Sequence, residues 1–303
     1  MSGTRGSRGP RGSREPQGPP QREAGRQHRP AGTATPGFTW EASDGCALRA
    51  TRFGSGPAVL LLHGGGPDHH SLLPLAVRLA DAFTVLLPDL RGYGRSVCRD
   101  PELHTWSRYT ADALELADRH SPEPVAVVGT GLGATIGLRA ALARPDRVGA
   151  VAVIGAEEIE DDTAKAAETA FLDAFAARIL TDGPAAAWEP ALAGMPPLIG
   201  AMVRDAIPRS DPASTAAACA IGRDRAFRDV HDLAPVTAPV LVVPGGDPRH
   251  PVATARAMVE ALPRGELAPV ALGPDWHTAD DLATGVLPAL RPFLLRHAAP
   301  SAP

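Results

Sequence analysis

Short, continuous hydrophobic runs recur along the chain after residue 37 and predict the strands of a buried sheet. Because the runs are continuous rather than alternating, their strands should be covered on both faces, as in parallel sheets. Two further extended segments flank an Asp44-Gly45 turn and predict an antiparallel hairpin. The hairpin strands are residues 38–41 and 46–51, and the buried strands are residues 58–62, 84–88, 125–128, 148–154, 239–243 and 267–272.

Helical patterns alternate with these strands and predict crossover connections. Such alternation indicates right-handed βαβ units, and therefore an α/β fold with a doubly wound, mostly parallel sheet. The predicted helices are residues 72–82, 107–120, 134–143, 253–262 and 278–296.

One segment, residues 157–235, breaks the alternation with helical patterns alone. Its predicted helices are residues 163–180, 184–192, 197–207 and 212–222. Helices inserted between two strands of one sheet should lie over the strand carboxyl ends, where open α/β sheets bind ligands. The segment is therefore predicted to be a helical cap on a core of residues 36–156 and 236–298, with a separate helical domain as the alternative.

The first 35 residues differ in composition from the rest of the chain. Gly, Arg, Pro, Ser and Gln dominate, and the segment has no aromatic or branched aliphatic residue. Burial of apolar surface therefore cannot offset the conformational entropy lost on ordering, and we expect a disordered tail. Residues 1–30 hold seven arginines against two glutamates, although the whole chain has a net charge of −4. A nucleic-acid-binding arm is the alternative. With no folded basic module beside it, we do not expect nucleic-acid binding.

Other features of the sequence restrict the class of protein. No run reaches the roughly 18–20 apolar residues of a membrane-spanning helix, and no apolar core of a secretory signal follows the N-terminal arginines. The cysteines Cys46, Cys98 and Cys219 are widely spaced and predict reduced thiols rather than a metal site. We expect a cytoplasmic protein without a membrane anchor; its oligomeric state is not predicted.

Two glycine-containing motifs follow neighbouring predicted strands. His63-Gly64-Gly65-Gly66-Pro67 places flexible backbone with free N–H groups after one strand, as an oxyanion requires. Residues 88–96, with the sequence PDLRGYGRS, follow the next strand. In this order the motifs resemble the α/β-hydrolase superfamily, with the glycine loop most similar to the proline iminopeptidase-like branch. The resemblance covers about residues 38–295 and implies an α/β-hydrolase sheet with an inserted cap.

A third motif stands where this superfamily carries its nucleophile elbow, G-x-S-x-G, between a strand and a helix. Here the sequence reads Gly129-Thr130-Gly131-Leu132-Gly133, so Gly131 takes the place of the serine. Glycine has no side chain to attack a substrate, and acyl-enzyme chemistry at this position is excluded. Thr130 precedes the apex of the turn and should point elsewhere. The resemblance further implies that backbone N–H groups of Gly65 and Leu132 form the oxyanion hole.

The remaining triad positions are occupied. Asp247 follows the strand at 239–243 and is the candidate carboxylate, whereas His277 follows the strand at 267–272 and is the candidate base. Their chain order matches the superfamily, and we expect them to form a hydrogen-bonded pair. Asp275 is a competing acid on the histidine's own loop. We expect His69 and His70, which follow the glycine loop, to be polar loop residues. His231 and His250 have no partner with metal-ligand spacing.

These residues leave three functions open. An Asp247–His277 pair beside an oxyanion hole predicts general-base chemistry on a small molecule, such as a lyase, isomerase or cofactor-independent oxygenase reaction, or activation of water. Alternatively, the chain is an inactive pseudo-hydrolase that binds a small ligand. In the third hypothesis Gly131 has inactivated a serine esterase or aminopeptidase. No motif predicts a metal, nucleotide or flavin cofactor.

Overall fold

The computed structural model describes residues 1–4, 6, 37–157, 159–247 and 249–298. The chain divides into a unit of residues 1–30 and a unit of residues 31–303. The predicted disordered tail, residues 1–35, lies outside the described residues except for 1–4 and 6, which are exposed and without regular structure. All elements below belong to the second unit.

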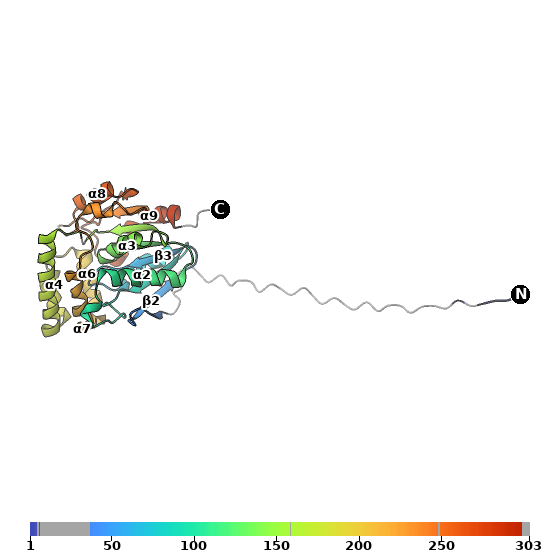
Figure 1. Cartoon of the computed structure of the whole chain (residues 1–303), viewed down its shortest axis with the longest axis horizontal. Helices are drawn as coiled ribbons and strands as arrows, with labels where there is room; N and C mark the ends of the chain where they lie inside the picture. The colour runs from blue at the N-terminus through green and yellow to red at the C-terminus, as the bar shows by residue number, and fades with distance from the viewer. Residues whose placement is uncertain (5, 7–36, 158, 248, 299–303) are drawn as a thin grey trace. The chain divides into compact units, whose positions relative to one another are not determined.

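The core of this unit is an eight-stranded sheet in the order β1-β2-β4-β3-β5-β6-β7-β8. Figure 1 labels β2 and β3 of this sheet, together with helices that pack around it. β1 pairs with β2, and β2 with β4, in antiparallel register; every other pairing is parallel. The mostly parallel sheet and the N-terminal hairpin were therefore predicted correctly. The strands are β1 Phe38–Glu41, β2 Ala47–Phe53, β3 Ala58–Leu62, β4 Thr84–Asp89, β5 Val125–Thr130, β6 Val148–Ile154, β7 Val240–Val243 and β8 Gly265–Leu267.

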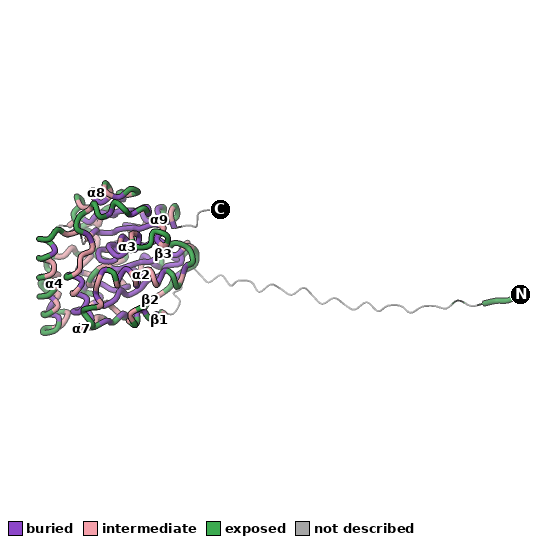
Figure 2. Tube along the Cα trace, viewed as in Figure 1, coloured by how far each residue is buried: buried purple, intermediate pink, exposed green. Residues whose placement is uncertain are grey.

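Helices cover both faces of the sheet, because side chains alternate between two hydrophobic clusters along each buried strand. On β3, Leu60 and Leu62 pack with α2, α3 and α8, whereas Val59 and Leu61 pack with α1 and α9. This two-sided cover defines a doubly wound fold. The helices are α1 Leu73–Leu79, α2 Trp106–His120, α3 Leu132–Ala143, α8 Val252–Ala261 and α9 Ala279–His297. Burial is concentrated along the strands (Figure 2).

The last strand differs from its prediction. β8 is only Gly265–Leu267, and the chain from residue 268 to 278 is a loop rather than the strand predicted at 267–272. The backbone N–H of Ala268 still donates to the carbonyl oxygen of Val242. Pro269 lacks a donor for a continuing ladder, so regular pairing ends there. This loop carries His277.

The segment between β6 and β7 is helical, as predicted. Among its described residues, the only strand-like pairing is a single bridge between Ile159 and Phe227. Trp188 and Val203 of this segment pack against Gly66 after β3. Its helices are α4 Asp162–Asp182, α5 Pro184–Leu192, α6 Pro197–Ala206 and α7 Pro212–Ala218, with the short helices η3 Ile207–Arg209, η4 Cys219–Arg223 and η5 Val230–Leu233.

Two further short helices, η1 His69–Leu72 and η2 Pro101–Leu103, follow the strands β3 and β4. No helix within the described residues combines the length and apolar character needed to cross a membrane.

Candidate active site

Gly131 occupies the turn between β5 and α3. Its backbone angles are φ 46° and ψ −116°, a left-handed conformation that favours glycine. Its N–H donates to the carbonyl oxygen of Ile154 at the end of β6, 3.2 Å away. The framing glycines are required by packing: a side chain on Gly129 would meet the backbone of α3, and one on Gly133 would meet the backbone of Leu62. The sharp strand-to-helix turn is thus present, with no side chain at its apex.

A carboxylate lies against this bare apex. Glu157 follows β6, and its Oε2 is 2.9 Å from the ideal position of a Cβ on Gly131, with Cδ at 3.2 Å and Oε1 at 3.6 Å. The Glu157 side chain is only 16% exposed. The space above the turn that a residue with a side chain would need is therefore taken by Glu157.

Glu157 belongs to a hydrogen-bonded line of three titratable groups. His250 Nε2 donates to Glu157 Oε1 over 2.6 Å, and His250 Nδ1 donates to Asp247 Oδ2 over 2.8 Å. Arg249 Nε also donates to Glu157 Oε1, over 3.0 Å, and its Nη2 reaches Glu168 on α4 at 3.2 Å. The His250 side chain is 6% exposed and that of Asp247 13%. This line is called the Asp247–His250–Glu157 network below.

The contacts between His250 and Glu157 favour the ionised form of this pair. Burial alone would lower the pKa of His250, but the hydrogen bond and charge of Glu157, together with those of Asp247, raise it above its ordinary value. Burial would raise the pKa of Glu157, yet the hydrogen bond from His250 and the charge of Arg249 lower it overall. An imidazolium between two carboxylates donates from both ring nitrogens, which matches both observed contacts.

No hydrogen bond between His277 and this network is found among the described residues. The His277 side chain is exposed, and its backbone N–H donates to Asp281 Oδ2 over 2.9 Å as part of the turn that begins α9. The Asp247 carboxylate is hydrogen-bonded to His250, so the expected Asp247–His277 hydrogen bond is not present among the described contacts. His277 lies on the loop between β8 and α9. Its catalytic role stays a prediction, and the competing acid Asp275 is exposed on the same loop.

Two residues of the network were not found from the sequence. Glu157 enters the sequence analysis only as the first residue of the predicted cap, and His250 only as a histidine without metal-ligand spacing. The i,i+3 spacing of Asp247 and His250 was the available signal, since a carboxylate on a tight turn can reach a ring three residues on.

The glycine loop after β3 lies beside the turn. An ideal Cβ on Gly64 would be 3.5 Å from the carbonyl oxygen of Thr130, and one on Gly65 would be 3.6 Å from the Tyr93 hydroxyl. Gly66, at φ 94°, packs against Trp188 Cζ2. Leu132 is the first residue of α3, where backbone N–H groups lack helical acceptors. These positions are compatible with the predicted oxyanion hole, which stays a prediction.

The His63 ring forms hydrogen bonds that stabilise the glycine loop. Its Nδ1 donates to the carbonyl oxygen of Gly64 over 2.8 Å, and its Nε2 accepts from the Leu90 N–H over 2.9 Å. Complete burial lowers its pKa and keeps the ring neutral, as this pair of bonds requires. Both ring nitrogens are engaged, so any contact of His63 with a ligand would come through its backbone.

One group of side chains has the chemistry of metal ligands. Single ligand atoms of Asp68, His69 and His70 lie within 4.8 Å of one another. However, Arg209 donates to both oxygens of Asp68, over 2.7 and 3.1 Å, and His69 Nδ1 bonds Asp89 over 2.6 Å. The guanidinium already balances the Asp68 charge, and we assign no metal there.

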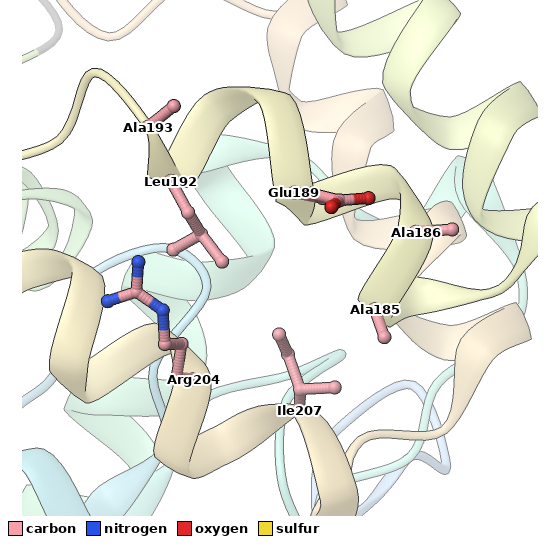
Figure 3. A pocket seen from close by; sticks show the side chains of 7 residues that line it. All are labelled: Ala185, Ala186, Glu189, Leu192, Ala193, Arg204 and Ile207. Atoms are coloured by element: carbon pink, nitrogen blue, oxygen red, sulfur yellow. The ribbon is translucent and has the colours of Figure 1, made fainter.

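A surface cavity of about 610 Å³ opens between α5 and the α6–η3 region (Figure 3). Its lining is mostly aliphatic, with one acidic and one basic side chain, and includes no member of the Asp247–His250–Glu157 network. The lining residues are Ala185, Ala186, Glu189, Leu192, Ala193, Arg204 and Ile207.

The fold and the sharp turn at Gly131 indicate the class of protein, and comparison with known proteins indicates the same class. The alpha/beta hydrolase family matches residues 59–294, most of the chain. The chain therefore belongs to the alpha/beta hydrolase family. An esterase from Thermogutta terrifontis, solved with malate bound, superposes with a TM-score of 0.71 at 23% identity, covering 86% of this chain and 99% of the esterase.

Curated relatives match over shorter stretches. An epoxide hydrolase from Caballeronia sordidicola is 38% identical over 112 residues, 36% of this chain and 34% of the relative. A fluoroacetate dehalogenase from Burkholderia is 38% identical over 105 residues, 33% and 34% of the two chains. The match spans about a third of the length of these relatives. The chain has hydrolase-like relatives, and its own reaction is a separate question.

Proposed function

We propose that this chain is an enzyme that acts on a small molecule without a serine nucleophile, through proton transfer by the Asp247–His250–Glu157 network. The observation that carries the proposal is the Glu157 carboxylate at the vacant turn, 2.9 Å from the Cβ position of Gly131 and bonded to His250. A buried carboxylate beside an imidazolium, at the position where this family carries out its chemistry, is a candidate acid–base centre.

The two groups have complementary roles. Because the pKa of Glu157 lies below its ordinary value, the carboxylate remains ionised at neutral pH and can accept a proton from a substrate. His250, with a raised pKa, can donate one. Asp247 fixes the ring from its other nitrogen. Backbone N–H groups of Gly65 and Leu132 would stabilise an enolate or other oxyanion, so lyase, isomerase or cofactor-independent oxygenation chemistry, or water activation, fits the site.

The helical segment 157–235 is proposed as the cap over this site, on a core of residues 36–156 and 236–298. Three contacts support it. Trp188 and Val203 pack against Gly66. Arg209 is bonded to Asp68 on the neighbouring loop. Arg249 joins Glu157 to Glu168 on α4. A ligand held above Gly131 would therefore touch this segment.

A second candidate is a binding protein without activity. Its support is the same carboxylate: Glu157 fills the space above the turn, while the described 610 Å³ cavity lies elsewhere, between α5 and α6. In the third candidate, an inactivated serine hydrolase, the network is the remnant of a triad. The three candidate functions differ in whether the chain turns over a substrate and in which histidine is needed for turnover.

The test is turnover of a panel of activated esters, lactones, epoxides and enolisable ketones by the full chain. Matched variants are His250→Gln, which removes the proposed proton donor, and His277→Gln, which removes the alternative histidine base. We expect native turnover that His250→Gln reduces at least about 100-fold and that His277→Gln leaves unchanged. If His277→Gln abolishes turnover instead, His277 is the base. No native turnover, with panel compounds still binding, favours the binding protein.

A further inference from the structure

Tyr93 lies in the glycine-containing motif that follows β4, between two glycines that packing requires. A side chain on Gly92, which has φ 90°, would begin 2.7 Å from the His104 ring. One on Gly94, which has φ 49°, would begin 2.5 Å from the Asp89 carboxylate. The backbone on both sides of Tyr93 is therefore fixed by close contacts.

The Tyr93 ring is held by a second ring. It packs nearly perpendicular to His63, with ring centroids 5.5 Å apart and an interplanar angle of 84°. His63 is itself fixed, because its two nitrogens are bonded to Gly64 and Leu90. Tyr93 is also partly buried against the core of the sheet domain. These contacts define the direction in which the phenol hydroxyl points.

The hydroxyl lies beside Gly65 of the glycine loop. Tyr93 Oη is 3.6 Å from the ideal Cβ position of Gly65. Among the described residues, and apart from the two chain neighbours of Gly65, it is the only atom within 4 Å of that point. Gly65 is exposed, so a substrate group can enter here. The adjacent Gly64 lies against Thr130, which places this space next to the turn at Gly131.

We propose that the Tyr93 hydroxyl contacts the substrate directly, donating a hydrogen bond to a carbonyl oxygen that the Gly65 N–H also binds. This inference rests on the proposed function, in which Glu157 accepts a substrate proton. When that proton leaves carbon for Glu157, the electron pair of the C–H bond forms the enolate and negative charge develops on the oxygen. A fixed hydroxyl donor stabilises this charge more than the neutral carbonyl. The substrate class is a carbonyl compound with an acidic C–H beside the carbonyl.

The second tyrosine provides an internal reference. The chain contains two tyrosines. Tyr109 is buried, and its hydroxyl donates to the carbonyl oxygen of Arg91 over 2.9 Å and contacts His104 Nδ1 at 2.9 Å. A label on tyrosine rings therefore gives two signals, one from the core and one from the position beside Gly65.

The experiment labels the full chain with 3-fluorotyrosine and titrates it with 4-nitrophenolate, a mimic of an enolate oxygen. Fluorine NMR should show two signals, and Tyr93→Phe assigns them by removing one. Phenylalanine keeps the ring against His63, so the variant should fold, as circular dichroism melting checks. We expect 4-nitrophenolate to shift the Tyr93 signal saturably and to leave the Tyr109 signal in place.

Affinity and turnover test the hydrogen bond itself. Tyr93→Phe should bind 4-nitrophenolate at least about tenfold more weakly, because a hydrogen bond to a charged oxygen is lost. Its affinity for 4-nitroanisole, which has the same ring without a negative oxygen, should be unchanged. With an enolisable ketone that the native chain turns over, kcat of Tyr93→Phe should fall at least about tenfold.

The proposal is overturned if the native chain shows no saturable binding of 4-nitrophenolate, or if the probe binds without moving the Tyr93 signal. Unchanged 4-nitrophenolate affinity or unchanged kcat in folded Tyr93→Phe would overturn it as well. Failure of the proposed function looks different. In that case no panel compound is turned over, yet the Tyr93 signal still shifts and Tyr93→Phe still weakens phenolate binding.

Discussion

Oε2 of Glu157 lies 2.9 Å from the point where a side chain on Gly131 would begin. Real Cβ atoms do not approach a carboxylate oxygen this closely without displacement of one of them. Glu157 and a side chain at position 131 therefore exclude each other in the observed arrangement. A side chain at position 131 would require the end of the Glu157 side chain to move from its place against the turn.

This exclusion predicts the behaviour of a restored serine. Gly131→Ser alone should show little hydrolysis of activated esters, because the new side chain meets Glu157 and adopts a left-handed backbone that costs about 1–2 kcal/mol. Gly131→Ser combined with Glu157→Ala should be more active than either single variant. Burst kinetics with a chromogenic ester measure acyl-enzyme formation. Equal activity of the single and double serine variants would show that Glu157 moves aside freely.

A second prediction concerns the protonation of His250. Because Glu157 and Asp247 raise its pKa, the His250 ring should titrate above 6.5, its ordinary value, in an NMR titration of ring protons. Glu157→Gln removes one of the two negative partners and should bring the pKa of His250 down. Titration of the native ring at or below 6.5 would contradict the ionised network.

The same shifts determine a pH window for stability. The raised pKa of His250 contributes stability that is present below pH 6.5 and is lost as pH rises through the folded-state value. The lowered pKa of Glu157 contributes stability that is present above pH 4.5 and is lost as pH falls through its folded-state value. The melting temperature difference between native chain and Glu157→Gln should thus be largest between pH 4.5 and 6.5. A difference that is flat from pH 4 to 9 would argue against this coupling.

A fourth prediction concerns the buried Arg91. Its side chain is 0% exposed and bridges Asp44 and Asp112, at 2.8 and 2.7 Å. Burial raises the pKa of Asp112 to about 6 even with Arg91 present, so Arg91→Met would leave Asp112 without its cation and Asp44 with only the longer contact to Arg108, at 3.7 Å. We expect a loss of about 3–5 kcal/mol in the free energy of unfolding, measured by urea denaturation.

The matched control is the exposed ion pair of Arg99 with Asp211, where the arginine side chain is 63% exposed. Arg99→Met should lower the free energy of unfolding far less than Arg91→Met, because solvent screens the pair. Similar losses for both variants would mean that Arg91 contributes no more than a surface charge.

The strands of the sheet could be predicted from the sequence, because strands buried on both faces are continuous apolar runs. The predicted bounds of β3 and β6, for example, match the structure. The sequence was insufficient at β8, where backbone pairing depends on contacts with β7 rather than on local residues. The glycine turn was located correctly, since Gly129 and Gly133 are required by the close packing of β5, α3 and β3.

The site was only partly predictable. Asp247 was identified by its position after β7, but its partner was assigned to His277 by analogy of chain order. In the structure Asp247 is hydrogen-bonded to His250 on the same turn, and His250 is hydrogen-bonded to Glu157, which follows the neighbouring strand β6. Contacts between strand ends depend on sheet order, which brings β6 beside both β5 and β7. No local pattern around Glu157 encodes that neighbourhood.

The central claim is that the Glu157 carboxylate, in the place of a missing side chain on Gly131, performs the chemistry. The most direct measurement is kcat/KM for the best panel compound with the native chain and with Glu157→Gln, which retains the shape and removes the charge. Glu160→Gln, a change of the same kind on a carboxylate that pairs with Lys165, is the control. The account predicts at least about a 100-fold loss for Glu157→Gln and native activity for Glu160→Gln. Undiminished turnover by folded Glu157→Gln would contradict it.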